Sequence, residues 1–389
     1  SGNLTLGGAA GGSIASIIGT GAGTLTKSGT GTWTLGGLNT YTGGTTINGG
    51  TLKAGSVTAF GTGAISVSSG AALDLGGQAM TSTGTLTLYG TGISAGGALL
   101  NSGGAATYAG LISLGSDASI MGGSGSITLS NSGTIGGSGN LTLGGAAGGS
   151  IASIIGTGAG TLTKSGSGTW SLSGSNAFTG ATSVSDGTLA LSGGGSIATS
   201  SGVTTSGSGV FSITGASSDV TITSLTGSSS ATTGVVLGGR TLTLSNASGT
   251  YSGVIDGTGG LALTTGTETL SGANTYTGGT TINGGTLKAG SVTAFGTGAI
   301  SVSSGAALDL GGQAMTSTGT LTLYGTGISA GGALLNSGGA ATYAGLISLG
   351  SDASIMGGSG SITLSNSGTI GGSGNLTLGG AAGGSIASI

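Results

Sequence analysis

Charged side chains are the main groups in this 389-residue sequence that could act as acids, bases or ion ligands, because it contains no histidine and no cysteine. Enzymes that cleave polysaccharides need clustered carboxylates, or an arginine or lysine base, on one face. The eight acidic and five basic residues here are single residues far apart in the sequence: Asp74, Asp117, Asp186, Asp219, Asp256, Glu268, Asp309, Asp352, Lys27, Lys53, Lys164, Arg240 and Lys288. The usual catalytic triads and zinc sites are excluded. We therefore expect no enzyme activity, no cofactor and no metal, and we expect Asp74 to point outward from an alternating strand.

Glycine-rich segments could bind phosphate or calcium, but neither site is predicted. With 98 glycines in the chain, a phosphate-loop spacing arises by chance, and no Gly-Lys-Ser or Gly-Lys-Thr is present. The segments 122–129 and 136–143 share the Gly-Gly-x-Gly frame of calcium-binding β-rolls. Ile127 and Leu141 stand where that repeat needs its aspartate ligand, so calcium is not expected.

Two further patterns bear on binding. Tyr41, Phe178 and Tyr276 occupy one slot of a repeated motif, with Trp33 and Trp170 eight residues before the first two. These rings could form a sugar-stacking platform, but packing in the core or at a corner is the favoured interpretation. Thr-x-Thr elements such as those at 24–26 and 85–87 raise ice binding by rows of hydroxyls. Their irregular spacing along the chain argues against that role.

The composition excludes several broad classes of protein. Only 3% of residues are charged, proline is absent and the net charge is −3. A mean hydropathy of +0.43 argues against disorder, which goes with low hydrophobicity and high net charge. Five basic residues leave no electrostatic footprint for nucleic acid. No apolar stretch reaches the length of a membrane-spanning helix, so no membrane insertion of this segment is expected.

Short strands are the predicted local structure throughout. Apolar residues alternate with serine and threonine and are bounded by glycine, which is typical of strands of three to five residues with one buried face. The alternating pairs are Ile65/Val67, Leu73/Leu75, Leu86/Leu88, Ile127/Leu129, Leu141/Leu143 and Leu261/Leu263. The absence of proline fits strands that must donate hydrogen bonds to a neighbour on each side.

Verbatim repeats decide how these strands are arranged. Residues 39–154 recur unchanged as 274–389, and residues 1–29 recur as 138–166. The repeat units are therefore a short one (1–137), a long one (138–372) and the start of another (373–389), where the long unit carries an in-phase insert at 176–273. A solenoid accepts whole extra coils because each coil contacts only its neighbours. The sequence predicts an all-β fold over 1–389, one continuous right-handed parallel β-helix (β-solenoid) with roughly 20 residues per coil and no helical domain.

Three segments, 31–52, 168–189 and 269–287, share a motif of the form Asn-x-aromatic-Thr-Gly, followed by an aliphatic residue and then Gly-Thr-Leu. The motif resembles the passenger-associated repeat of bacterial autotransporters. The aligned positions, which we assign as structural motif residues, are Asn39, Tyr41, Gly43, Ile47 and Leu52; Asn176, Phe178, Gly180, Val184 and Leu189; and Asn274, Tyr276, Gly278, Ile282 and Leu287. Leu38 departs from the pattern, because the other copies have Ser175 and Ala273.

The resemblance implies a parallel β-helix presented outside the bacterial outer membrane, on the cell surface or secreted. It does not imply a particular ligand, since adhesins and other surface proteins share this scaffold. We expect a non-enzymatic structural or adhesive fibre whose partner is a second copy of itself or a cell or matrix surface. The alternatives are the spacer of an adhesin whose recognition site lies elsewhere, an ice-binding protein, or a polysaccharide-active β-helix.

Overall fold

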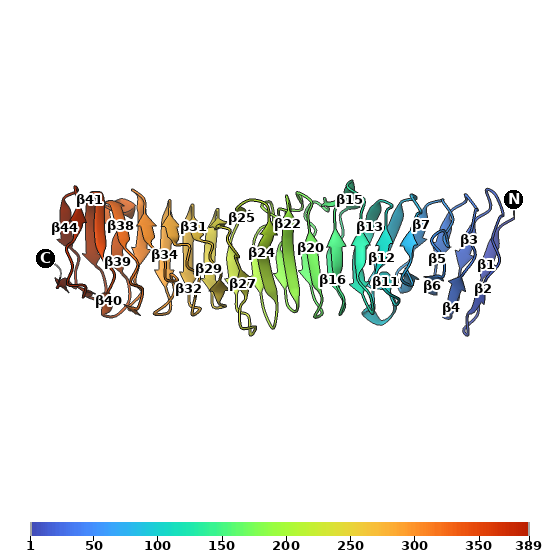
Figure 1. Cartoon of the computed structure of the whole chain (residues 1–389), viewed down its shortest axis with the longest axis horizontal. Helices are drawn as coiled ribbons and strands as arrows, with labels where there is room; N and C mark the ends of the chain where they lie inside the picture. Colours follow the sequence, from blue (N-terminus) through green and yellow to red (C-terminus); the bar gives the residue numbers. More distant parts are fainter. Residues whose placement is uncertain (1, 388–389) are drawn as a thin grey trace. The chain divides into compact units, whose positions relative to one another are not determined.

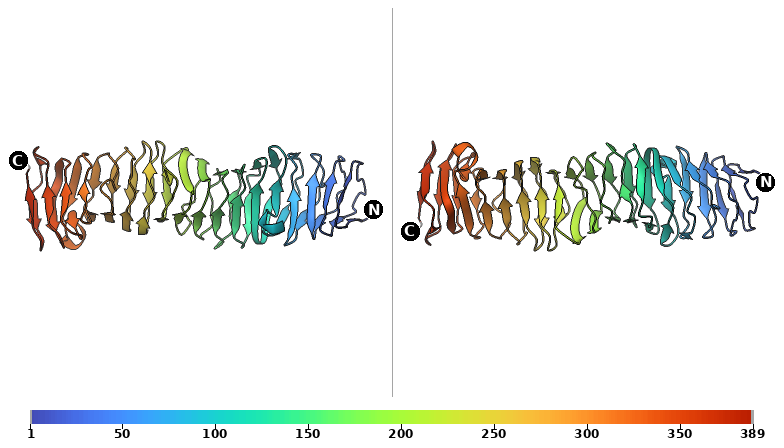
Figure 2. Two further views of the ribbon diagram at one scale, coloured as in Figure 1. Left: turned by 90° about the horizontal axis from the view of Figure 1, so that it is seen from below. Right: turned by 90° about the horizontal axis from the view of Figure 1, so that it is seen from above.

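The computed structural model describes residues 2–387, which divide between Ser200 and Ser201 into two compact units. Each unit is a parallel β-solenoid in which short strands stack coil upon coil (Figures 1 and 2). The chain makes about 18 turns of about 21 residues each, which confirms the predicted fold and coil length. Within the described residues, helical structure is confined to two 3₁₀ turns, η1 (Ile93–Ala95) and η2 (Ile328–Ala330). None of the helices in residues 2–387 has the length and apolar character needed to cross a membrane.

The strands of the first unit form parallel columns, one strand per coil. The first column is β1 (Leu4–Leu6), β3 (Leu25–Lys27), β5 (Thr45–Ile47), β7 (Ile65–Val67), β10 (Leu86–Gly90) and β13 (Ile112–Gly122), and it continues from β13 into β16 (Leu141–Gly144), β19 (Leu162–Lys164) and β21 (Thr182–Val184). The second column also reaches β13, through β2 (Gly12–Ile14), β4 (Thr32–Leu35), β6 (Gly50–Ala54), β8 (Ala71–Asp74) and β11 (Leu99–Asn101). The third column is β9 (Ala79–Met80), β12 (Ala106–Tyr108), β14 (Ile127–Leu129), β17 (Gly149–Ile151), β20 (Thr169–Leu172) and β22 (Thr188–Gly193), and a separate pair is formed by β15 (Thr134–Gly137) and β18 (Ile154–Ile155).

The second unit is built in the same way. The first column is β23 (Val203–Thr205), β26 (Leu225–Gly227), β29 (Ala247–Tyr251), β32 (Gly266–Leu270), β34 (Gly285–Ala289), β36 (Ala306–Asp309), β39 (Leu334–Asn336) and β41 (Ile347–Gly357). The second column is β25 (Val220–Ile222), β28 (Leu242–Leu244), β31 (Leu261–Leu263), β33 (Thr280–Ile282), β35 (Ile300–Val302) and β38 (Leu321–Gly325), followed by β41 and β44 (Leu376–Gly379). Two shorter columns are β24 (Val210–Ala216), β27 (Val235–Val236) and β30 (Ile255–Asp256), and β37 (Ala314–Met315), β40 (Ala341–Tyr343), β42 (Ile362–Leu364) and β45 (Gly384–Ile386), while β43 (Gly371–Gly372) lies beside β41.

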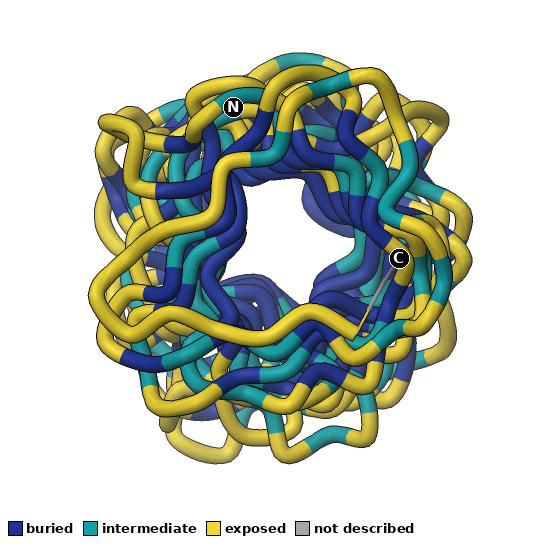
Figure 3. Tube along the Cα trace, turned by 90° about the vertical axis from the view of Figure 1, so that its left-hand side faces the viewer, coloured by how far each residue is buried: buried dark blue, intermediate teal, exposed yellow. Residues whose placement is uncertain are grey.

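The alternation seen in the sequence becomes an inside and an outside. In β7 the side chains of Ile65 and Val67 are buried while Ser66 between them faces outward, and most three-residue strands repeat this pattern. Buried residues line the inner side of the coils in each unit, and exposed residues lie outside (Figure 3). Burying a side chain of this size contributes about 1.5–3 kcal/mol, so the aliphatic columns are the main source of stability.

Candidate functional site

The motif asparagine joins three successive coils through its side chain. Asn39 is buried, and its Oδ1 accepts a hydrogen bond from the backbone N of Ile18 in the preceding coil (2.8 Å). Its Nδ2 donates to the carbonyl oxygen of Ala59 in the following coil (2.6 Å). The same two contacts recur at the other two motif asparagines, as Ile155 N to Asn176 Oδ1, Asn176 Nδ2 to Ser196 O, Ile255 N to Asn274 Oδ1 and Asn274 Nδ2 to Ala294 O. A carboxamide is required here because one contact needs an acceptor and the other a donor.

The motif aromatic is a core residue. Tyr41 is fully buried, and its hydroxyl shares a hydrogen bond with Thr45 Oγ1 (2.6 Å), which also contacts the carbonyl oxygen of Phe60. Burial raises the pKa of Tyr41 to about 12. Tyr276 and Thr280 repeat this contact at 2.6 Å. Because these rings are enclosed, they offer no face for stacking on a sugar.

Phe178 fills the same slot without a hydroxyl. Thr182, the counterpart of Thr45, instead shares a hydrogen bond with Ser200 Oγ (2.9 Å), and Ser200 donates to the carbonyl oxygen of Gly180 (2.9 Å). The slot therefore accepts either ring as long as the neighbouring threonine keeps a partner.

We expect Tyr41→Phe to lower the free energy of unfolding by about 1 kcal/mol, the net contribution of one buried hydrogen bond. The effect stays small because Thr45 keeps its contact with the Phe60 carbonyl. Urea unfolding followed by circular dichroism measures the change, with Tyr41→Ala as the contrast, for which we expect about 4 kcal/mol from the cavity. Equal losses for the two variants would show that the hydroxyl, and not the ring, holds this corner.

The remaining motif positions pack one coil against the next. A Cβ at Gly43, Gly180 or Gly278 would overlap backbone atoms of the preceding coil, so only glycine allows the coils to approach this closely. The aliphatic positions are fully buried, and they are Ile47, Val184, Ile282, Leu52, Leu189 and Leu287. The twelve other motif residues thus lie in contacts between coils or in the core. The three glycines make the close approach of the coils possible.

A family model described as passenger-associated-transport-repeat matches residues 25–54, 162–191 and 265–289. The chain carries three passenger-associated-transport-repeats. Each match covers one of the three corners described above. No curated protein and no solved structure matches the chain.

The third repeat differs from the others at the inward position of a tryptophan. In the first two repeats a tryptophan lies against a glycine of the preceding coil, Trp33 against Gly12 and Trp170 against Gly149. The indole Nε1 donates to a backbone carbonyl oxygen at 2.8 and 2.9 Å, respectively. Glu268, six residues before the motif asparagine like both tryptophans, stands in this slot.

Glu268 is fully buried with its carboxylate inside the second unit. Within the described residues, neither carboxylate oxygen has a hydrogen-bond partner. Burial raises the pKa of Glu268 from 4.5 to about 8, because the charged form loses its hydration without any compensation. This substitution escaped the sequence analysis, although aligning the three repeats backwards from the asparagine would have revealed it.

Two buried lysines secure the same corner in the first two repeats. Lys27 Nζ donates to the carbonyl oxygens of Ser28, Gly29 and Gly49 at 2.8–2.9 Å. Lys164 makes the matching contacts with Ser165, Gly166 and Asp186 at 2.6–3.0 Å. Burial lowers the pKa of both amines, that of Lys164 to about 8, and nearby Asp186 opposes the shift at Lys164. Each amine satisfies carbonyls from two successive coils, which is a structural role.

Asp74 lies on the outer side of its strand, as expected, but it is buried there and not exposed to solvent. The corner after β11 covers the outer side of β8, where Asp74 Oδ1 accepts hydrogen bonds from the backbone N of Gly76 and Ser102, both at 2.9 Å. Asp74 Oδ2 accepts a hydrogen bond from Ser102 Oγ (2.6 Å) and forms an ion pair with Lys53 Nζ (3.8 Å). Three coils thus bring together groups that are far apart in the sequence.

This cluster contains a lysine, an aspartate and a serine, a set that could suggest nucleophilic catalysis. Lys53 Nζ also donates to Ser102 Oγ at 2.7 Å, so the amine is a hydrogen-bond donor to the hydroxyl and not a free base. The carboxylate is fully engaged in holding the corner. The same cluster recurs as Lys288, Asp309 and Ser337 in the second unit. Its chemistry is that of a clamp between coils.

Proposed function

We propose that this chain is a non-enzymatic structural or adhesive segment of an autotransporter passenger, exposed outside the bacterial cell, and that it associates with copies of itself. The observation that carries the proposal is the presence of three passenger-associated-transport-repeats in a β-solenoid whose lysines, together with Asp74 and Asp309, are engaged in contacts between coils. A scaffold of this kind lengthens by adding whole coils and needs no new chemistry. That the two units form one continuous solenoid remains a prediction.

The self-association proposal rests on the low charge of the chain, 3% of its residues, which permits copies to pack together, and on the surface that one coil offers to the next, seen at β44 and β45. Residues 373–389 repeat residues 138–154, and in the first unit that sequence is covered by the next coil, where Trp170 lies on Gly149. Leu143 is consequently fully buried there. Its counterpart Leu378 is 56% exposed, beside a pocket of about 220 Å³.

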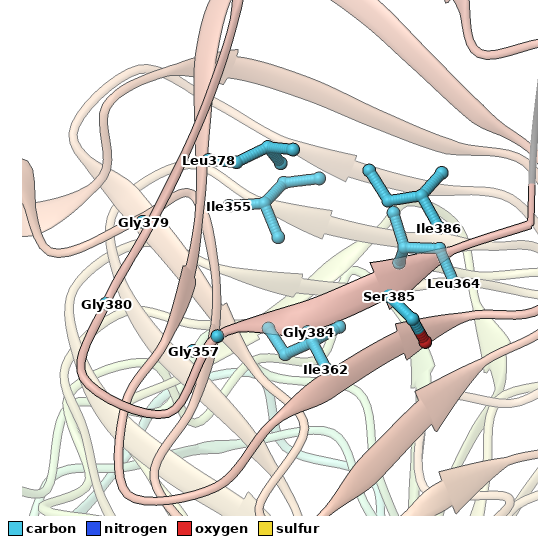
Figure 4. A pocket seen from close by; sticks show the side chains of 11 residues that line it. Ile355, Gly357, Ile362, Leu364, Leu378, Gly379, Gly380, Gly384, Ser385 and Ile386 are labelled. Carbon is cyan, nitrogen blue, oxygen red and sulfur yellow. The ribbon is translucent and has the colours of Figure 1, made fainter.

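Figure 4 shows the aliphatic side chains of this pocket, with Leu378 and Ile355 facing Leu364 and Ile386. The glycines that accommodate the tryptophan in the first unit have their counterparts in Gly379 and Gly384. An open strand edge with an apolar hollow is a template for another coil. In the first unit the next coil of the same chain covers this surface, so we propose that a coil of this repeat from a second copy fits the same edge wherever it is free.

We expect the 389-residue chain to form concentration-dependent oligomers in sedimentation velocity, and the double variant Leu378→Lys, Ile386→Lys to remain largely monomeric. Two charges at this edge would be buried without partners in the assembly. Leu38→Lys is the matched control, because Leu38 is 55% exposed at a corner where the other repeats carry serine or alanine. A wild-type chain that is monomeric at every concentration tested would contradict self-association, and electron microscopy of the same samples distinguishes filaments from closed oligomers.

A further inference from the structure

Tyr89 is an exposed aromatic residue on the outer surface of the first unit. It lies in β10 and is 38% exposed. One face of its ring lies on Gly115 of the next coil, where a Cβ would overlap the ring carbons Cε1 and Cζ. The ring is therefore held flat against the backbone with its other face directed away from that backbone. An aromatic ring supported in this way offers a flat apolar surface to a ligand.

A β-bulge creates this arrangement. The pairing of β10 with β13 is regular up to Leu88, which lies opposite Leu114, and then shifts so that Gly90 lies opposite Ala118. The three residues 115–117 lie opposite Tyr89 alone, so β13 carries two extra residues here, and all three are exposed. Bulges of this kind redirect side chains and are frequent next to functional sites. Here the bulge supplies both the glycine under the ring and a serine beside it.

Four serines line a hollow together with the ring. The hollow has a volume of about 380 Å³ and is lined by Ser66, Ser68, Ser69, Tyr89 and Ser116, so it draws on three successive coils. None of these lining residues is charged. The nearest acid in sequence, Asp117, is engaged by the backbone N and the Nδ2 of Asn140 at 2.9 and 3.0 Å.

A column of hydroxyls leads to the hollow along the same sheet. Successive coils place Thr5, Thr26, Thr46, Ser66, Thr87 and Ser113 opposite one another in parallel register. Neighbouring members are one strand spacing apart, about 4.8 Å. An extended ligand that runs across the coils would therefore meet a hydroxyl at every step and the tyrosine at one end.

The tyrosine and its bulge recur in the second unit. Tyr324 is 37% exposed and lies on Gly350, and the bulge recurs between Leu323 and Gly325. A separate hollow of about 350 Å³ is lined by Thr281, Ser301 and Thr322 of the hydroxyl column in that unit, and Tyr324 is not part of its lining. The hydroxyl column itself therefore forms a groove in the second unit.

We propose that Tyr89 and Tyr324, with their flanking hydroxyl columns, are binding sites for an uncharged polysaccharide. The C–H face of a sugar ring packs on an aromatic ring, and its hydroxyls exchange hydrogen bonds with serine and threonine, which act as both donors and acceptors. The uncharged lining favours a neutral glycan over an anionic one. This inference goes beyond the scaffold role and does not depend on self-association.

The test is affinity electrophoresis of the 389-residue chain in gels containing hydroxyethyl cellulose, dextran or mannan, with polygalacturonate as the anionic comparison. We expect at least one neutral polysaccharide to retard the chain. Isothermal titration with oligosaccharides of that glycan should then give two equivalent sites. Tyr89→Ala should remove one of the two, and the double variant Tyr89→Ala, Tyr324→Ala should weaken retardation about tenfold, as expected for the loss of one aromatic contact at each site.

Matched variants separate binding from folding. Tyr89→Phe with Tyr324→Phe keeps the ring and should retain most of the binding. Thr107→Ala with Thr128→Ala removes hydroxyls from a different column, that of β12 and β14, and should have no effect. Circular dichroism and sedimentation of all variants should match the wild type, because Tyr89 and Tyr324 are surface residues. Failure of every neutral glycan to bind, binding of polygalacturonate alone, or retardation unchanged in the double tyrosine variant would overturn the proposal. Thermal hysteresis without glycan binding would replace it with ice binding.

Discussion

The second unit should lose stability as the pH rises from about 4.5 to about 8, and this loss should disappear in a Glu268→Gln variant. Glu268 is the only glutamate of the chain, it is fully buried, and its carboxylate oxygens have no partner within the described residues. Burial raises its pKa to about 8 in the folded state. The ionised form is therefore much less favourable in the fold than in the unfolded chain.

The sign of the effect follows from proton binding. Below pH 4.5 the group is protonated in both states, and its full contribution to stability is present. Between pH 4.5 and 8 the folded state keeps a proton that the unfolded state has released, so the free energy of unfolding falls as the pH rises. Above pH 8 both states are ionised and the loss is complete. A shift of this size corresponds to about 3–5 kcal/mol.

Two measurements test this prediction directly. Labelling with ¹³C-glutamate gives a single carboxyl signal, whose titration should show a midpoint far above that of a free glutamate. Hydrogen exchange of β29, β32 and β34, corrected for the intrinsic pH dependence of exchange, should show weaker protection at pH 8 than at pH 5. Local exchange is the appropriate measure because coils in a solenoid can open separately.

Substitutions at the slot provide the controls. Glu268→Gln keeps the shape of the side chain and removes the titrating group. In this variant the exchange protection of β29, β32 and β34 should vary with pH no more than the protection of the first unit does in the wild type. Glu268→Trp restores the residue of the first two repeats, and Gly249 in the preceding coil leaves room for the ring as Gly149 does for Trp170. A Glu268 titration midpoint near 4.5 would show that the carboxylate is hydrated, and would contradict the prediction.

The architecture was accessible from the sequence because it depends on local alternation and on verbatim repetition. Ile65 and Val67 predict a short strand with two inward side chains, and β7 has that form. The insert of whole coils at 176–273 is compatible with a fold in which contacts connect only neighbours. Both signals lie in the chain itself, so no knowledge of long-range packing was needed.

The individual side chains were less predictable wherever a neighbouring coil changes the environment. Alternation placed Asp74 on the outside, but the corner after β11 covers that side and buries it. The exposure of Tyr89 depends on a bulge in the following coil at 115–117, which no local pattern announces. Periodicity determines which face of a strand a residue occupies, whereas burial depends on loop lengths in adjacent coils, and these lengths vary from coil to coil.

The motif glycine should not tolerate even the smallest side chain, and Gly43→Ala should destabilise the first unit by about 3 kcal/mol. A Cβ at Gly43 would lie 2.6 Å from the carbonyl carbon of Gly23 and 2.7 Å from the carbonyl oxygen of Ala22. These are backbone atoms of the preceding coil, so no side chain can move aside. The coils would have to separate locally, which disrupts the hydrogen bonds between β3 and β5 and the aliphatic contacts beneath them.

The adjacent residue provides a matched control within the same dipeptide. A Cβ at Gly44 would meet only the carbonyl oxygen of Ala64, at 3.2 Å, and the second repeat has alanine at this place, Ala181. Gly44→Ala should therefore be neutral or stabilise by up to about 1 kcal/mol, because alanine restricts the unfolded chain.

Urea unfolding of the two variants beside the wild type, followed by the fluorescence of Trp33 and Trp170 in the first unit, measures the difference. If Gly43→Ala and Gly44→Ala proved equally stable, the close approach of the coils would not be the reason for glycine at this position. A large difference between two alanine substitutions at neighbouring residues can only come from what each Cβ meets. The repeat would then be defined by the spacing between its backbones, which explains why Gly43, Gly180 and Gly278 stay glycine while the slots of Tyr41 and Ile47 accept Phe178 and Val184.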